Sequence, residues 1–236
     1  MGPDLARRAT AEFVGTAFLV AIVVGSGISA QRLSPANIGL ELLENSIATG
    51  AGLIALILAL GPVSGGHFNP VVTMADRILG GTTTPDAGIY IVVQTLGACL
   101  GAIVANLMFD LPAIDISTHT RSSSGLWLGE LVAAFGLLVV ILGVVRSGRA
   151  SAAAFAVGGY IAAAYWFTSS TSFANPAVTI GRMLSNTFAG IAPGSVPMFI
   201  VMQVLGALLA VALGVFLFPH TPATDLVVPH ESPEVP

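Results

Sequence analysis

Two short stretches of the sequence carry the residues best suited to handling a small polar solute. The first reads Asn69-Pro70-Val71, and the second, 106 residues further along, reads Asn175-Pro176-Ala177. Asn can cap the free N–H groups at the start of a helix, and Pro suits the first helical position because it has no N–H to leave unpaired. We therefore expect two helix N-termini, each with a side-chain amide that can donate a hydrogen bond to a passing oxygen.

Other kinds of chemistry find little support. The sequence has no nucleophile paired with a base, no metal-binding cluster and no phosphate-binding loop, so an enzyme is the least favoured class and no cofactor or metal is expected. The single Cys99 cannot build a disulfide framework or a Cys-based metal site within one chain. Eight Lys+Arg against twelve Asp+Glu, without a basic patch, argue against nucleic acid as a partner.

The composition places these stretches in a membrane. The chain of 236 residues is 55% hydrophobic and only 8% charged, and its mean hydropathy is +0.90, far above that of soluble domains. Six stretches approach the length of about 20 apolar residues that a membrane helix needs. They are residues 10–29, 42–61, 88–109, 126–146, 151–168 and 197–218.

An internal repeat organises these spans. YIVVQTLGACLGA (90–102) aligns with FIVMQVLGALLAV (199–211), and AEFVG (11–15) aligns with GELVA (129–133), in the same order as the Asn-Pro stretches. Each half then has three spans and one short segment, so the halves insert with opposite orientations, as in transporters and channels with inverted repeats. We expect the halves at about 10–115 and 125–219 of a single channel domain, 10–219.

The two short segments, 71–79 and 177–185, are too short to cross the bilayer. In an inverted repeat they would enter from opposite faces and meet N-terminus to N-terminus near the midplane. Non-helical backbone at that depth must be buried in protein or line an aqueous cavity. Each helix N-terminus carries about half a positive charge, so such a cavity would repel cations and admit neutral hydroxylated molecules.

The ends and the orientation follow from charge and composition. Residues 1–9 would form an N-terminal arm, and the Pro-rich segment 220–236 a disordered cytoplasmic tail. Five Arg residues would lie on the side of the termini and three on the other side. The positive-inside rule then places both termini in the cytoplasm.

Together these residues resemble the aquaporin and aquaglyceroporin superfamily of major intrinsic proteins. The resemblance rests on SGGHFNP (64–70) and FANPAVT (173–179), on Glu12 with Glu130, and on Gln94 with Gln203. It implies an all-α membrane protein with six transmembrane helices and two re-entrant half-helices, passive conduction, and a homotetramer with one pore per subunit. It also implies that Glu12 and Glu130 are buried and brace the half-helix loops. The plain alternative places these carboxylates at helix ends in the membrane interface.

The sequence departs from the family pattern at the positions that the resemblance assigns to the pore. Val71 stands where most members have Ala, and Val178 stands where most have an Arg that narrows the pore. Spacing from the two Asn residues adds Thr49, Ala163 and Ser172 to the selectivity filter, with Tyr160, Ala164 or Tyr165 as alternatives to Ala163. The set Thr49, Ala163, Ser172 and Val178 is small and neutral, which predicts a wide pore with weak discrimination among neutral solutes.

The sequence leaves the roles of two further residues undecided. Arg182 lies four residues after Val178 and so on the same face of the half-helix. It could replace the missing filter Arg, but we expect it in the outer vestibule, at the favourable C-terminal end of the helix dipole. His67 could contact solute or bond to loop backbone at the inner mouth, and we expect the backbone role.

The resemblance extends to the solutes. NPAVTIGR and the uncharged filter resemble the bacterial channels associated with arsenic-resistance operons, which implies arsenite and other metalloid hydroxides, methylated arsenicals, glycerol, urea and water as solutes, in the bacterial inner membrane. The alternatives are a secondary transporter, which would need a coupling group, a water-selective aquaporin, and a closed structural protein.

Overall fold

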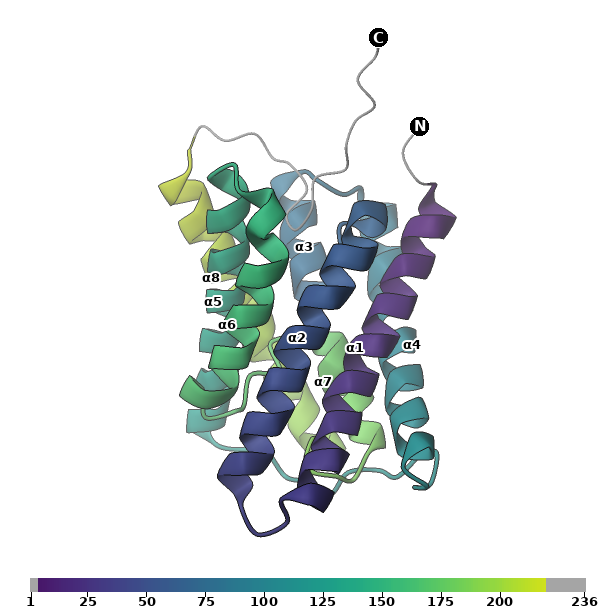
Figure 1. Ribbon diagram of the computed structural model, residues 1–236. Helices are drawn as coiled ribbons and strands as arrows, with labels where there is room; N and C mark the ends of the chain where they lie inside the picture. The colour runs from purple at the N-terminus through teal and green to yellow at the C-terminus, as the bar shows by residue number, and fades with distance from the viewer. Residues whose placement is uncertain (1–3, 220–236) are drawn as a thin grey trace.

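The computed structural model describes residues 4–219, and these form a bundle of helices (Figure 1). The eight α-helices are α1 (Leu5–Leu33), α2 (Ile38–Ser64), α3 (Pro70–Leu79), α4 (Thr84–Met108), α5 (Ser124–Arg146), α6 (Ala153–Phe167), α7 (Pro176–Gly181) and α8 (Val196–Leu217). Short 3₁₀ turns at Ala150–Ala152, Arg182–Leu184 and Pro193–Ser195 extend or precede α6, α7 and α8.

Six of the helical segments are long and apolar enough to cross a membrane, and they correspond to the six predicted stretches. The short α3 and α7 occupy opposite halves of the bundle, and both begin near its middle (Figure 1). The first turn of α1 and the last turn of α8 lie at the same end. The chain is thus an all-α membrane protein with six spanning helices and two half-helices in an inverted repeat.

The repeat is visible in the packing. α1 packs on α4 and α2, and the equivalent α5 packs on α8 and α6. Small residues allow the closest approaches: a Cβ on Gly97 would lie 2.4 Å from the Phe13 carbonyl oxygen, and one on Gly206 would lie 2.3 Å from that of Leu131. The two halves therefore bring helix backbones together at the same place by the same means.

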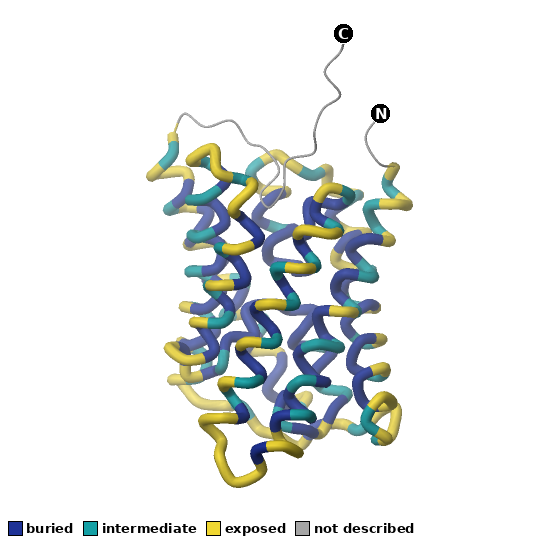
Figure 2. The backbone as a smooth tube through the Cα atoms, viewed as in Figure 1, coloured by how far each residue is buried: buried dark blue, intermediate teal, exposed yellow. Residues whose placement is uncertain are grey.

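Burial follows the arrangement expected of a helical membrane protein. Buried residues face the centre of the bundle, and exposed residues lie around its outside (Figure 2). Large apolar side chains such as Phe18, Leu96, Phe155 and Leu209 are exposed on this outer surface, where lipid would solvate them.

Two predicted boundaries need correction. Residues 5–9, expected in an N-terminal arm, form the first turns of α1, whose N-terminus is capped by the Asp4 side chain. The second half-helix was expected to run from 177 to 185, but regular α-helix ends at Gly181 and continues as the 3₁₀ turn Arg182–Leu184. The predicted tail, 220–236, lies outside the described residues.

Candidate functional site

The two Asn-Pro stretches meet at the centre of the bundle. The Oδ1 atom of Asn69 accepts from Val71 N at 3.1 Å, and that of Asn175 accepts from Ala177 N at 3.0 Å and Val178 N at 3.2 Å. Both half-helices thus begin with Asn as the capping residue and Pro in the first turn.

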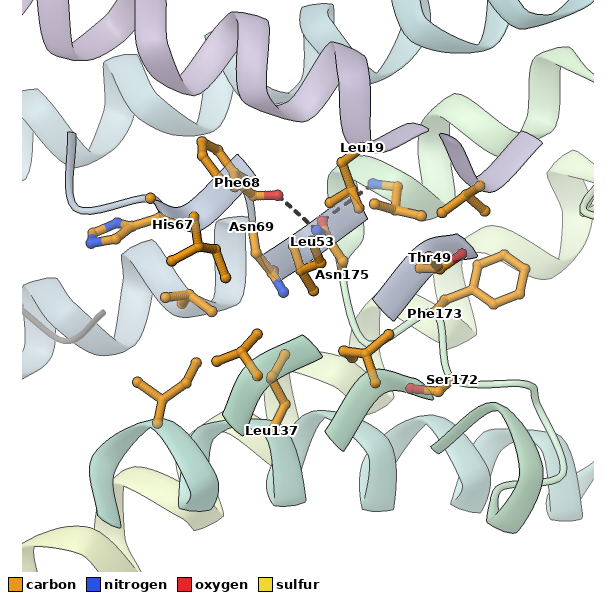
Figure 3. Close-up of a pocket in the computed structure, with 18 of the residues that line it drawn as sticks. Leu19, Thr49, Leu53, His67, Phe68, Asn69, Leu137, Ser172, Phe173 and Asn175 are labelled. Atoms are coloured by element: carbon orange, nitrogen blue, oxygen red, sulfur yellow. Dashed lines mark hydrogen bonds between the residues drawn. The ribbon is translucent and has the colours of Figure 1, made fainter. Parts of the chain in front are cut away.

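The amide nitrogens of the same residues connect the two loops. Asn69 Nδ2 donates to the Ala174 carbonyl oxygen at 2.8 Å. Asn175 Nδ2 donates to that of Phe68 at 2.7 Å (Figure 3). Because an amide NH₂ group has two hydrogens, each Asn keeps one N–H that is not used in its cross-loop bond.

The backbone just before each Asn adopts an uncommon conformation. Phe68 has φ 47° and Ala174 has φ 50°, in the left-handed region that favours glycine. Such a conformation costs about 1–3 kcal/mol in a residue with a side chain and persists where the surroundings fix it. Here the carbonyl groups of these two residues accept the cross-loop bonds, which help to fix it.

Glu12 holds the first loop from inside the bundle. It is fully buried, and its carboxylate accepts from Ser64 Oγ at 2.6 Å, His67 N at 2.9 Å, Phe68 N at 2.7 Å and Gln94 Nε2 at 2.7 Å. The carboxylate therefore satisfies two backbone N–H groups that no helix would satisfy, which is the geometry of a brace.

Glu130 does the same for the second loop. It too is fully buried, and it accepts from Phe173 N and Ala174 N, both at 2.9 Å, and from Gln203 Nε2 at 2.5 Å. Gln203 also donates to Thr179 Oγ1 at 2.9 Å. Neither carboxylate lines the central cavity, and their burial excludes the alternative position at exposed helix ends.

A cavity of about 50 Å³ lies beside the two Asn residues (Figure 3). This volume is enough to admit water. Its sides are aliphatic and come from both halves of the repeat, with Leu19 and Val23 of α1 matched by Leu137 and Ile141 of α5.

The predicted pore residues divide into two groups. Those that line the cavity are Thr49, His67, Asn69, Ser172, Asn175, Val178 and Arg182. The remaining residues of the two motifs, Pro70, Val71, Pro176 and Ala177, are buried but do not line it.

The prediction that Ala163 lines the filter is wrong. Ala163 is exposed on the outer surface of α6, whereas Tyr165, one of the alternatives, lines the cavity and places its hydroxyl 3.1 Å from Thr49 Oγ1. Two residues along an α-helix turn a side chain by about 200°, so this small spacing error points to the opposite face. No motif on α6 anchors the residue spacing from which the filter position was projected.

Sequence reasoning also missed Phe173, which lines the cavity at 4% exposure. The repeat held a signal for it, because Phe173 and His67 each precede their Asn by two residues. With Tyr165 and Phe173 present, the expectation of a lining made only of small side chains is wrong.

Arg182 is not a solvated vestibule residue. It is only 2% exposed and lines the cavity. Its Nε donates to the Ala189 carbonyl oxygen, and its guanidinium carbon lies 3.4 Å from the centre of the Phe173 ring. Although it follows directly after α7, as expected, its charge is held inside the protein.

His67 differs from expectation in one respect. Its backbone N–H donates to Glu12, but its ring Nδ1 pairs with the Thr73 hydroxyl at 3.1 Å instead of loop backbone. The ring also packs edge-on against Tyr90, with 5.5 Å between ring centres. A side-chain hydroxyl therefore orients the imidazole where it borders the cavity.

Fold and site together define a class: a polytopic helical membrane protein whose two half-helices point their N-termini at a shared internal cavity. The family comparison agrees. The model of the major intrinsic protein family matches residues 2–172, so the chain belongs to that family. It is a multi-pass membrane channel for small neutral solutes and not an enzyme.

Individual relatives support the assignment. The chain is 48% identical to an aquaglyceroporin, AqpS, of Rhizobium meliloti over 98% of both chains. It is 32% identical to aquaporin AqpM of Methanothermobacter thermautotrophicus, over 88% of this chain and 95% of that one. The X-ray structure of the aquaglyceroporin from Plasmodium falciparum matches with a TM-score of 0.69 at 19% identity, covering 92% of this chain and 98% of that one, which shows the fold.

Proposed function

We propose that the protein is a passive, bidirectional channel for small neutral hydroxylated solutes: arsenite and other metalloid hydroxides, methylated arsenicals, glycerol, urea and water. The observation that carries this proposal is the meeting of two capped helix N-termini at one cavity, with an amide of Asn69 and of Asn175 on its wall. Positive helix ends disfavour cations, and the amide N–H groups replace hydrogen bonds that a neutral solute loses on leaving water.

Solutes larger than water are supported by the chemistry of the lining. Val178 puts an aliphatic side chain at the position expected to carry Arg, and the rings of Tyr165 and Phe173 lie beside the hydroxyls of Thr49 and Ser172. A polyol or a neutral metalloid hydroxide has the matching character, with oxygens that bond to polar groups and a remainder that packs on apolar ones. The likeness to a protein named aquaglyceroporin points the same way.

The setting completes the proposal. We place the protein in the bacterial inner membrane, with both termini in the cytoplasm and four copies forming a homotetramer. The distribution of Arg residues supports this orientation, and the common end of α1 and α8 is compatible with it (Figure 1). On this basis α3 lies on the cytoplasmic side and α7 on the outer side.

Stopped-flow light scattering of proteoliposomes tests the proposal. Vesicles with the purified full chain should shrink and reswell faster than empty vesicles in gradients of glycerol, urea and arsenite, with rates proportional to solute concentration. Acceleration of water flux alone would identify a water-selective aquaporin, and no acceleration for any solute would identify a closed structural protein.

The same assay separates a channel from a secondary transporter. A transporter would show saturating flux, or flux that stops when ion gradients are collapsed. Within residues 4–219 the buried carboxylates of Glu12 and Glu130 are bonded to the loops and do not line the cavity. We therefore expect a solute flux that does not depend on the ion gradients.

A further inference from the structure

On the α7 side, the cavity is bordered by polar groups whose hydrogen-bonding capacity is not fully used by the described residues. The Ser172 side chain is 3% exposed, and its Oγ has no hydrogen-bond partner within the described residues. A hydroxyl buried without a partner costs free energy, and such groups normally bond to water or ligand. Ser172 lines the cavity, as Thr49 and Phe173 also do (Figure 3).

Arg182 also has hydrogen-bond donors that bond to no described residue, and it is charged. Its Nε bonds to Ala189, but its two terminal nitrogens donate to no protein group within residues 4–219, although the side chain lines the cavity. No described carboxylate forms a salt bridge with it, and Glu130 is committed to Phe173, Ala174 and Gln203. A buried charge without a counter-ion is rare because its desolvation is costly.

Aromatic packing fixes where this charge lies. Two guanidinium groups approach the Phe173 ring, with the carbon of Arg182 at 3.4 Å and that of Arg121 at 5.2 Å from its centre. Arg121 is itself anchored to the carbonyl oxygens of Gly190 and Phe188. Phe173 and Ala189 therefore hold the Arg182 head group in place, and these contacts limit the directions in which its free N–H groups can donate.

The repeat does not require an Arg here. The residue equivalent to Arg182 in the first half, 106 positions earlier, is Asp76, which is buried but does not line the cavity. The cation is thus a feature of the α7 side alone.

We infer that Arg182 and Ser172 form a solute-selecting site on the α7 side of the cavity. In this site the Arg182 guanidinium, four residues after position 178, donates hydrogen bonds to solute oxygens and repels cations. This deepens the proposed function and rests on it. The ligand class is a neutral solute with at least two oxygens close together, which the fork of an Arg and a neighbouring hydroxyl can bind at the same time.

Proteoliposomes with the full chain test the site through Arg182→Met, which keeps an unbranched apolar stem and removes the charge and the donors of the guanidinium. We expect the ratio of glycerol to water flux to fall about five-fold, the equivalent of one lost hydrogen bond, and potassium leak per water flux to rise about ten-fold, since a nearby fixed charge is removed. Arg182→Lys should keep the potassium leak low and lose part of the glycerol preference.

Arg32→Met is the matched control, because Arg32 also donates to a backbone carbonyl and stacks on a ring, that of Phe109, but is exposed and does not line the cavity. It should behave like wild type. If Arg182→Met also keeps the wild-type flux ratio and leak, the inference is wrong while the channel stands. If wild type conducts no solute, the proposed function fails and the inference falls with it.

A second measurement leaves Arg182 in place and so does not depend on that variant folding. In a Cys99→Ala background, Ser172→Cys should react about ten-fold faster with an anionic than with a cationic methanethiosulfonate reagent, after correction for their rates with a free thiol. The reason is that the Arg182 cation, held on the ring of the next residue, Phe173, attracts one reagent and repels the other. The Cys99→Ala parent gives the background. Equal corrected rates, or no reaction, would overturn the placement of Arg182 and Ser172 in the conduit.

Discussion

At the scale of single residues, Asn175 combines capping with a bond between the two loops. Asn175→Asp would keep the caps on Ala177 and Val178 but set a carboxylate oxygen against the Phe68 carbonyl oxygen, where Nδ2 now donates at 2.7 Å. We expect lower thermal stability in detergent and a clear rise in potassium leak from proteoliposomes, because negative charge at the centre attracts cations. Asn186→Asp is the control, since within residues 4–219 the Asn186 side chain bonds only through its Oδ1, which accepts from Thr118. A conducting Asn175→Asp channel without increased leak would contradict the role of the amide.

Val178 offers the complementary change, from a neutral to a charged lining. Val178→Arg would place a second guanidinium within one helical turn of Arg182 and fill part of a cavity of only about 50 Å³. We expect glycerol flux to fall about ten-fold, with water flux reduced far less, because steric exclusion acts first on the larger solute. Stopped-flow rates for both solutes on the same vesicles measure this. An unchanged ratio would mean that position 178 does not limit passage.

At the scale of elements, α1 and α4 depend on close backbone contact. Gly97→Ala would put a Cβ 2.4 Å from the Phe13 carbonyl oxygen, and overpacking of this kind costs about 1–3 kcal/mol. Gly88→Ala in the same helix meets nothing within 4 Å, and it should be neutral or slightly stabilising because Ala favours helix over Gly. Thermal unfolding in detergent compares the two variants, and equal midpoints would contradict the packing described for α1 and α4.

The re-entrant loops depend on the two carboxylates. Glu130→Gln would replace one of the two acceptor oxygens with an NH₂ group, which would face the N–H group of either Phe173 or Ala174, because each of these bonds to a different oxygen. Leaving a buried donor unpaired costs about 1–3 kcal/mol, so both stability and solute flux should fall. Glu44→Gln is the control, because one Glu44 oxygen accepts from Ser34 and the other has no partner within the described residues. Wild-type flux in Glu130→Gln would show that the loop does not need this brace.

The elements were largely predictable because the signals that specify them are local or repeated. Apolar length marks the six spans, Asn-Pro marks each half-helix start, and the offset of 106 residues pairs Asn69 with Asn175. The lining of α6 was not predictable in the same way. Tyr165 and Ala163 differ by two positions in a helix that is apolar all round and has no motif, so only three-dimensional packing decides which one faces the cavity.

Arg182 shows a different limit of sequence reasoning. Its position on the face of Val178 followed from helical spacing, but its burial follows from contacts with Ala189 and Phe173, which come from the loops on either side of α7. Loop conformations of this kind, including the positive φ of Thr171 and Ser172, leave no periodic signal in a sequence.

At the scale of the whole molecule, the outer surface of the bundle is too apolar for water, and α1 and α4 leave a shallow apolar hollow between them lined by Phe13, Phe18 and Leu100. Lipid tails or neighbouring copies must cover it. For the proposed homotetramer we expect a particle of four times the chain mass of 23.9 kDa after correction for detergent. Light scattering coupled to size-exclusion chromatography measures that mass, and a monomer with full solute flux would contradict the tetramer without affecting the pore.

The reciprocal bonds between the loops have a consequence for biosynthesis. Ala174 O completes the hydrogen bonding of Asn69, and Phe68 O completes that of Asn175, so neither half can finish its own loop. Before the second half has been made, the Asn69 amide and the Phe68 carbonyl lack these two partners. The centre of the bundle is therefore complete only once the second loop has docked on the first, and a chain that stops before residue 174 cannot form it.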